Sequence, residues 1–167
     1  MSIFLRAIEF LGLSIWLGSD VFLSFVVAPG AFSVLASRDE AGAIVGYSLT
    51  RMHWIGLVCG AVILLVRVLR RRSLIALVAP AALCVLLMII LTVISQVAVS
   101  PRMAVLRVQM GSIESATAKR STEVTAEGNP LLAEFEQLHA ISVGLESGVL
   151  LAGMVALILM VQRAQVR

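Results

Sequence analysis

Four long apolar stretches dominate the chain and are separated by polar segments. They cover residues 10–32, 44–66, 74–99 and 138–161. A helix needs roughly 20 residues to cross a hydrocarbon core of about 30 Å, so each stretch is long enough to span a bilayer. The pattern predicts an all-α fold, an integral membrane four-helix bundle in which residues 1–167 form a single membrane domain with an outer loop at about 101–137.

Polar residues near these stretches indicate where helices begin. Ser37 and Glu40 have the spacing of a capping box, which predicts that the second helix begins just after Ser37. Asn129 followed by Pro130 is typical of an N-cap and first helical position, so we expect the fourth helix to begin outside the bilayer. Residues 111–128 lack an apolar period, which predicts a loop or a weak helix.

Glycine, proline and tryptophan add detail to the predicted helices. Gly56 and Gly60 form a GxxxG pair, which allows close helix approach and is expected to pack within the bundle. Pro80 is expected to kink the third helix. Trp16 and Trp54 are interpreted as packing or interface residues.

Basic residues predict the orientation of the helices, because positively charged flanks are retained in the cytoplasm. Four spans place one group of arginines on a single side together with both termini: Arg6, Arg67, Arg70, Arg71, Arg72, Arg163 and Arg167. The basic residues of the other side are sparse and mixed with acids. We therefore expect cytoplasmic N and C termini in a multi-pass protein of the inner or plasma membrane.

Composition agrees with this fold. Of the 167 residues, 60% are hydrophobic and 14% are charged, and the mean hydropathy is +1.03. The pI of about 9.5 does not indicate a nucleic-acid partner, because the basic residues lie near helix ends, so the expected partner is the lipid bilayer. Cys59 and Cys84 lie in apolar runs without a CxxC spacing and are interpreted as core residues.

Four ionisable residues inside the apolar stretches need an explanation, because charge in hydrocarbon is costly unless it is paired. They are Asp20, Arg51, His53 and Glu146. Counted from the cytoplasmic arginines at about 1.5 Å per residue, Asp20 and His53 lie at about 21 Å, Arg51 at about 24 Å and Glu146 at about 25 Å. Three helices thus place charge at one level, which predicts an intramembrane polar cluster.

Arg51 is the expected centre of this cluster, because its planar guanidinium can bridge Asp20 and Glu146. Two acids and one arginine leave one negative charge, which a low dielectric disfavours. A proton on one carboxyl, a protonated His53 or a bound cation would neutralise it. A structural clamp that sets helix register explains the same residues, and both interpretations stay open.

His139 and Ser142 precede Glu146 on one face of the fourth helix, at steps of three and four residues. They are expected to line or gate an outer vestibule. The alternative for His139 is an interfacial histidine bonded to a carbonyl group or to the outer loop.

Five short motifs cover nearly the whole chain in order. They are Trp16-Leu-Gly18, Val26-Val-Ala28-Pro29, Arg51-Met-His53-Trp54, Ser100-Pro101-Arg102 and Phe135-Glu-Gln-Leu-His139-Ala-Ile-Ser142. Together they resemble the transmembrane protein 205-like family, a four-helix membrane domain of unknown function. The resemblance implies the architecture and the outer His and Arg positions but no reaction. Glu146 departs from the family pattern, which has a polar or small residue there, often Asn.

Three functions of different classes follow. No catalytic triad, phosphate-binding glycine loop or HExxH motif appears in the sequence, so an enzyme is not expected. The first function is a non-catalytic membrane scaffold without a cofactor. The second is handling or transport of a small cation, a proton or a divalent metal, with Asp20, His53 and Glu146 as ligands. The third is a b-type haem protein with His53 and His139 as axial ligands, although counting separates the two by about 15 Å.

Overall fold

The computed structural model describes residues 2–118 and 130–165, and every regular element in these ranges is a helix. The elements are α1 (Ser2–Phe22), η1 (Leu23–Val27), α2 (Ala28–Val34), α3 (Arg38–Arg71), η2 (Leu74–Val78), α4 (Pro80–Ile94), η3 (Ser95–Val99), α5 (Ser100–Ala118) and α6 (Pro130–Gln165). The elements η1 and η3 are π-helical turns that join the helices on either side of them, whereas η2 is a short 3₁₀ helix.

Four helical segments in the described ranges are long and apolar enough to cross a membrane. They are Ile3–Val34, Arg38–Arg71, Pro80–Met110 and Pro130–Gln162. Large apolar side chains such as Phe25, Val97 and Leu151 are exposed on their outer faces, where lipid is the suitable solvent. The predicted all-α, multi-pass membrane fold is confirmed.

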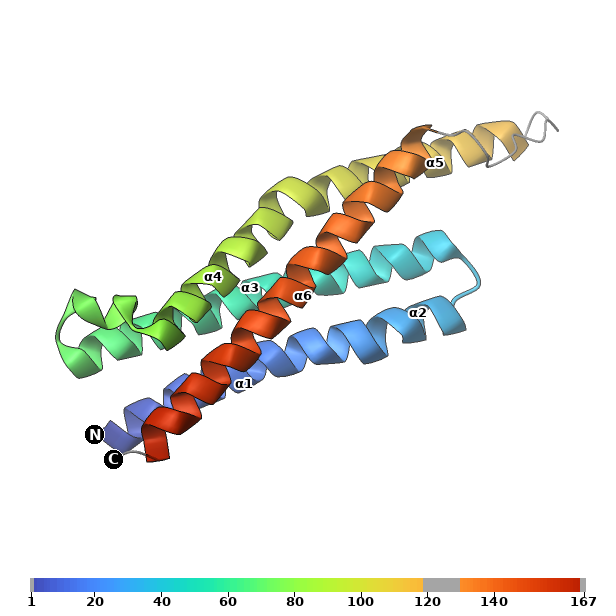
Figure 1. Cartoon of the computed structure of the whole chain (residues 1–167). Helices are drawn as coiled ribbons and strands as arrows, with labels where there is room; N and C mark the ends of the chain where they lie inside the picture. The colour runs from blue at the N-terminus through green and yellow to red at the C-terminus, as the bar shows by residue number, and fades with distance from the viewer. Residues whose placement is uncertain (1, 119–129, 166–167) are drawn as a thin grey trace.

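The helices converge at one end of the bundle and separate toward the other. Figure 1 shows the N and C termini together at the end where α1, α3, α4 and α6 approach one another, and we call this the terminal end. At the opposite, distal end, α2 lies beside α3 and α5 lies beside α6. The two pairs splay apart there, so the bundle is tightest toward its terminal end.

Two predicted helix starts are confirmed. The helix α3 begins at Arg38, and the Ser37 hydroxyl accepts a hydrogen bond from the backbone N–H of Glu40 at 3.4 Å, as a capping box requires. The helix α6 begins at Pro130. Asn129 lies outside the described residues, so its capping role stays a prediction.

The third span differs from its prediction at both ends. Its helix begins at Pro80, which occupies the first helical position and does not kink the helix, because Ala79 before it is extended (φ −64°, ψ 138°). The apolar residues before it form η2 instead. At the distal end the helix continues through η3 into α5, so much of the expected outer loop at 101–137 is helical. Residues 119–129 lie outside the described part of the chain.

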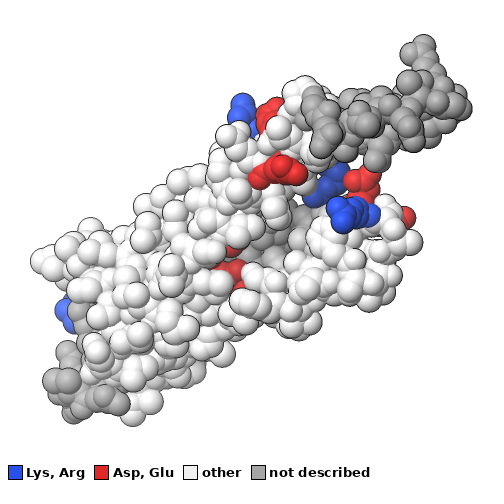
Figure 2. All heavy atoms as spheres, turned by 45° about the vertical axis from the view of Figure 1, so that its right-hand side comes forward, with Lys and Arg blue, Asp and Glu red and all other residues white. Residues whose placement is uncertain are grey.

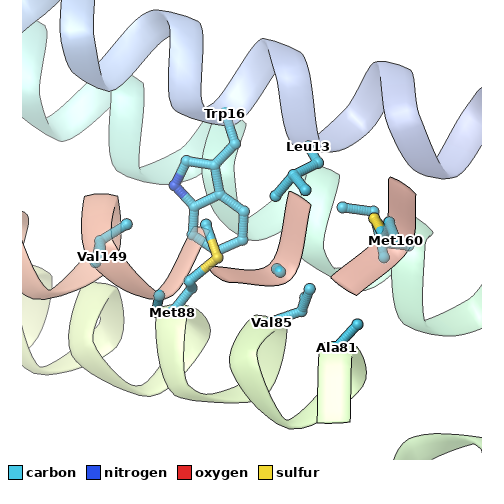
Figure 3. Close-up of a cluster of buried hydrophobic side chains, with 10 residues drawn as sticks. Leu13, Trp16, Ala81, Val85, Met88, Val149 and Met160 are labelled. Carbon is cyan, nitrogen blue, oxygen red and sulfur yellow. The ribbon is translucent and has the colours of Figure 1, made fainter. Parts of the chain in front are cut away.

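Trp16 lies at the centre of the hydrophobic core (Figure 3). It is 1% exposed and lies against the faces of Gly56 and Gly60, where a Cβ atom on either glycine would collide with the indole ring. The GxxxG pair therefore packs within the bundle, as predicted. Trp54, by contrast, is exposed on the outer surface. Cys59 and Cys84 are free thiols, half-buried against the core.

Candidate functional site: a buried acid and histidine cluster

Three of the predicted polar residues meet midway along the bundle. Asp20 lies near the end of α1, His53 lies in the middle of α3, and Glu146 lies in α6. Asp20 and His53 are fully buried, and the Glu146 side chain is 12% exposed. The Asp20 carboxylate lies within electrostatic range of both other side chains. The structure thus brings these three side chains from α1, α3 and α6 near one another.

His53 connects two other helices through its ring nitrogens. Its Nε2 lies 2.7 Å from Oε1 of Glu146, and its Nδ1 lies 2.7 Å from Oε1 of Gln96. Both partners are acceptor oxygens, so an imidazolium, which carries a proton on each nitrogen, satisfies both contacts. The contact with Glu146 is then a charge-assisted hydrogen bond.

The turn η3 supplies two further residues that sequence reasoning missed. Gln96 bonds to His53, and the Ser95 hydroxyl donates to Oε1 of Glu146 at 3.1 Å. The backbone N–H of Ser100 bonds to the Ser95 carbonyl, five residues back, which defines the π-turn. Such turns often occur at functional sites. The signal in the sequence is an adjacent Ser and Gln in an otherwise apolar stretch. We call Asp20, His53, Ser95, Gln96 and Glu146 the central cluster.

Several buried oxygens near the central cluster lack hydrogen-bond partners. They are both carboxylate oxygens of Asp20, Oε2 of Glu146, and the hydroxyl of Thr92, which lies one turn before Ser95. Ser24, one turn after Asp20, lies near its carboxylate without completing a hydrogen bond. Buried polar atoms normally have partners, so these oxygens can still accept a proton or a cation.

Arg51 does not form the predicted bridge. Its side chain is exposed, and its guanidinium lies over the Tyr47 ring, 5.1 Å from the ring centroid. Neither oxygen of Asp20 bonds to it, and Glu146 bonds to His53 and Ser95 instead. Helical geometry explains the difference: residues two apart on a helix point in directions about 200° apart, so the buried His53 directs Arg51 outward.

The two residues predicted for an outer vestibule lie on the distal side of Glu146. Ser142 is buried one turn away from it. His139 is exposed, and its ring lies parallel to that of Phe135, with 6.4 Å between the centroids. Ser142 therefore continues the polar face toward the distal end, while His139 lies at the surface.

Arg107 joins three helices at the distal end, although the sequence indicated only an outer-loop residue. Its Nη1 donates to the Gly42 carbonyl of α3 at 2.7 Å. Its guanidinium also lies 5.7 Å from the ring centroid of Phe135 in α6. Figure 2 shows basic and acidic side chains around the distal end, and acidic atoms at mid-length of the molecule in a hollow between the helices.

Residues 11–112 match a domain of unknown function named DUF4149, which covers more than half of the chain. The chain belongs to the DUF4149 family. The matched range includes Asp20, His53 and Gln96 but ends before Glu146. No curated protein and no solved structure matches the chain. The DUF4149 match is consistent with a membrane domain of unknown function and gives no evidence for the transmembrane protein 205-like resemblance.

The described side chains of this DUF4149 chain do not form the metal or haem sites that the sequence suggested as alternatives. Within residues 2–118 and 130–165, no three His, Cys, Asp or Glu side chains are placed to hold a metal ion, so the expected set of Asp20, His53 and Glu146 does not form. Both ring nitrogens of His53 already have partners, which leaves neither for a haem iron. The free carboxylate oxygens suit a proton or a small hard cation better.

The DUF4149 chain has a second ionic group near its terminal end. Oε1 of Glu9 accepts a hydrogen bond from Arg70 at 2.7 Å, and Oε2 lies 3.4 Å from Nε of Arg67. Glu9 and Arg67 are buried, and Arg70 is half-buried. We call these three residues the terminal clamp. Since both oxygens of Glu9 face arginine nitrogens, the clamp ties α1 to α3.

Proposed function

We propose that this multi-pass membrane protein reversibly binds a proton at the central cluster, with Asp20 as the acceptor. One observation supports it above the others: Asp20 is fully buried, and neither carboxylate oxygen has a hydrogen-bond partner. An ionised carboxylate without a partner in hydrocarbon is unfavourable by several kcal/mol, and a proton removes that cost. The nearby Glu146 carboxylate adds repulsion between two like charges.

Charge counting supports the same site. An imidazolium at His53 balances the Glu146 carboxylate, to which it is bonded. The side chains that η3 contributes, Ser95 and Gln96, are uncharged. Asp20 is then the one acid of the central cluster without a balancing charge, and a proton on it makes the cluster neutral. Binding and release break no covalent bond other than the O–H bond, so we propose a protein that is not an enzyme.

A membrane scaffold is the second candidate. The terminal clamp favours it, because the buried Glu9 faces arginines with both oxygens, as a purely structural ionic group should. In this case the central cluster would set helix register and take up no proton. The transmembrane protein 205-like resemblance, cytoplasmic termini and location in the inner or plasma membrane agree with either candidate.

Infrared spectroscopy of the purified protein in lipid nanodiscs tests the proposal, because protonated and ionised carboxyl groups absorb at different frequencies. We expect a pH-dependent carboxyl band that disappears in Asp20→Asn. The matched control is Glu136→Gln, which changes an exposed acid of α6 and should retain the band.

Three outcomes would overturn the proposal. A wild-type spectrum with no buried carboxyl band at any pH, or a band that survives in Asp20→Asn, would favour the scaffold. A band displaced by millimolar sodium at constant pH would assign the site to a metal cation and not to a proton alone.

A further inference from the structure

We infer that Asp20 exchanges its proton with water at the distal end only, and that Glu146 is the residue through which the proton passes. This inference rests on the proposed function and adds its direction. It follows from a difference in packing between the two sides of the central cluster.

The terminal side of the central cluster is closed by apolar packing. All members of the hydrophobic core lie on this side, between the cluster and the chain termini: Leu13, Trp16, Ile63, Ala81, Val85, Met88, Val149, Ala152, Ala156 and Met160. Trp16 and Met88 are at most 1% exposed, and Figure 3 shows them facing each other between α1 and α4. Beyond this core, the terminal clamp joins α1 and α3. Among the described side chains on this side, the buried Thr92 hydroxyl lies one turn from Ser95, and the apolar core separates it from the terminal clamp.

The distal side contains no part of that core, although Arg107 ties α3 to α5 and contacts α6 there. Glu146 is the partly exposed acid of the central cluster, whereas Asp20 behind it is fully buried. Ser142 provides a buried hydroxyl one turn further toward the distal end. Acidic atoms are visible at mid-length in the hollow shown in Figure 2, where the helix pairs separate. In the inferred route, water reaches the partly exposed Glu146 from this side.

The contacts of Glu146 suit a group that passes a proton on. Its Oε1 is held by His53 and Ser95, while its Oε2 has no hydrogen-bond partner. A proton taken from water by Oε2 moves to a carboxylate oxygen of Asp20, directly or through one water molecule. Glu146 is then ionised again and paired with His53, and release follows the same steps in reverse.

Cysteine accessibility tests the direction. In a background without Cys59 and Cys84, we expect Ser142→Cys to react with a small cationic methanethiosulfonate at least about tenfold faster than Ala156→Cys. Position 156 lies in the hydrophobic core and becomes accessible only when the core packing opens transiently. Both positions lie on the inner face of α6, on opposite sides of Glu146, so each controls for the other. Equal rates, or a faster reaction at position 156, would overturn the inference.

Hydrogen exchange tests the role of Glu146. After transfer to D₂O, the Asp20 carboxyl band should shift to its deuterated position at least about tenfold more slowly in Glu146→Gln than in wild type, while Glu136→Gln exchanges at the wild-type rate. Reaction of Ser142→Cys with the methanethiosulfonate should also slow deuteration of the Asp20 carboxyl group. Unchanged rates with the Asp20 band present would overturn the route and leave the proton site intact. Loss of the band in wild type would instead refute the site itself.

Discussion

The terminal clamp and the central cluster both contain buried acids, but the carboxylate oxygens are paired in the clamp and largely unpaired in the cluster. At the terminal clamp, the two oxygens of Glu9 face Arg70 and Arg67 at 2.7 and 3.4 Å. In the central cluster, Asp20 has no hydrogen-bond partner at either oxygen, and Glu146 shares one oxygen with His53 and leaves the other unbonded.

This contrast separates charge that holds helices together from charge that can change. An acid whose oxygens face fixed cations is not stabilised further by a proton, and removal of that acid leaves buried positive charge without a partner. An acid with free oxygens in a low dielectric is stabilised when it is neutralised. The three predictions below test this difference, from the largest expected effect to the smallest.

Replacing the clamp acid should have the largest effect. Glu9→Ala removes the carboxylate shared by two arginines, so we expect the free energy of unfolding to fall by about 3–5 kcal/mol. Chemical denaturation in detergent micelles measures it. Glu136→Ala, at an exposed acid, is the control and should change stability little. A loss below about 1 kcal/mol for Glu9→Ala would mean that the clamp does not stabilise the bundle.

Neutralising the central acid should act in the opposite direction. Asp20→Asn keeps the shape of the side chain but is neutral without taking up a proton, so we expect stability to stay equal or to rise by up to about 2 kcal/mol at neutral pH. The same denaturation experiment applies, with the exposed Asp39→Asn as control. A large loss would show that Asp20 is engaged in a structural interaction, as in a scaffold.

Arg51 should show the smallest effect. Its exposed guanidinium contacts only the Tyr47 ring among the interactions described above, so Arg51→Gln should change the free energy of unfolding by no more than about 0.5 kcal/mol. Arg70→Gln is the matched comparison on the same helix and should cost about 1–3 kcal/mol, because its bond to the buried Glu9 is lost. Equal losses in the free energy of unfolding would indicate that Arg51 takes part in a buried ionic interaction.

Part of the candidate site was predictable from the sequence because depth follows from counting. A helix rises about 1.5 Å per residue, so distances from the flanking arginines placed Asp20, His53 and Glu146 at a common level. Counting also placed Arg51 in the cluster beside His53, which was wrong because residues two apart on a helix point in directions about 200° apart. Burial in the bundle selects His53.

Other features depend on tertiary contacts that helical periodicity cannot predict. The π-turn in η3 changes the direction in which Ser95 and Gln96 project, and it turns an inconspicuous polar pair into contacts with Glu146 and His53. Arg107 was predicted in an outer loop, but α5 continues as a helix and brings it against Gly42 and Phe135.

The sequence by itself determined the number of spans, the starts of α3 and α6 and the common level of Asp20, His53 and Glu146, because span length, capping and helical rise are local properties of the chain. Only the tertiary structure decided which polar atoms are paired and on which side of the central cluster the core closes the bundle. These depend on the rotation of each helix against its neighbours, which is set by the packing of side chains distant in sequence, such as Trp16 against Gly56 and Gly60.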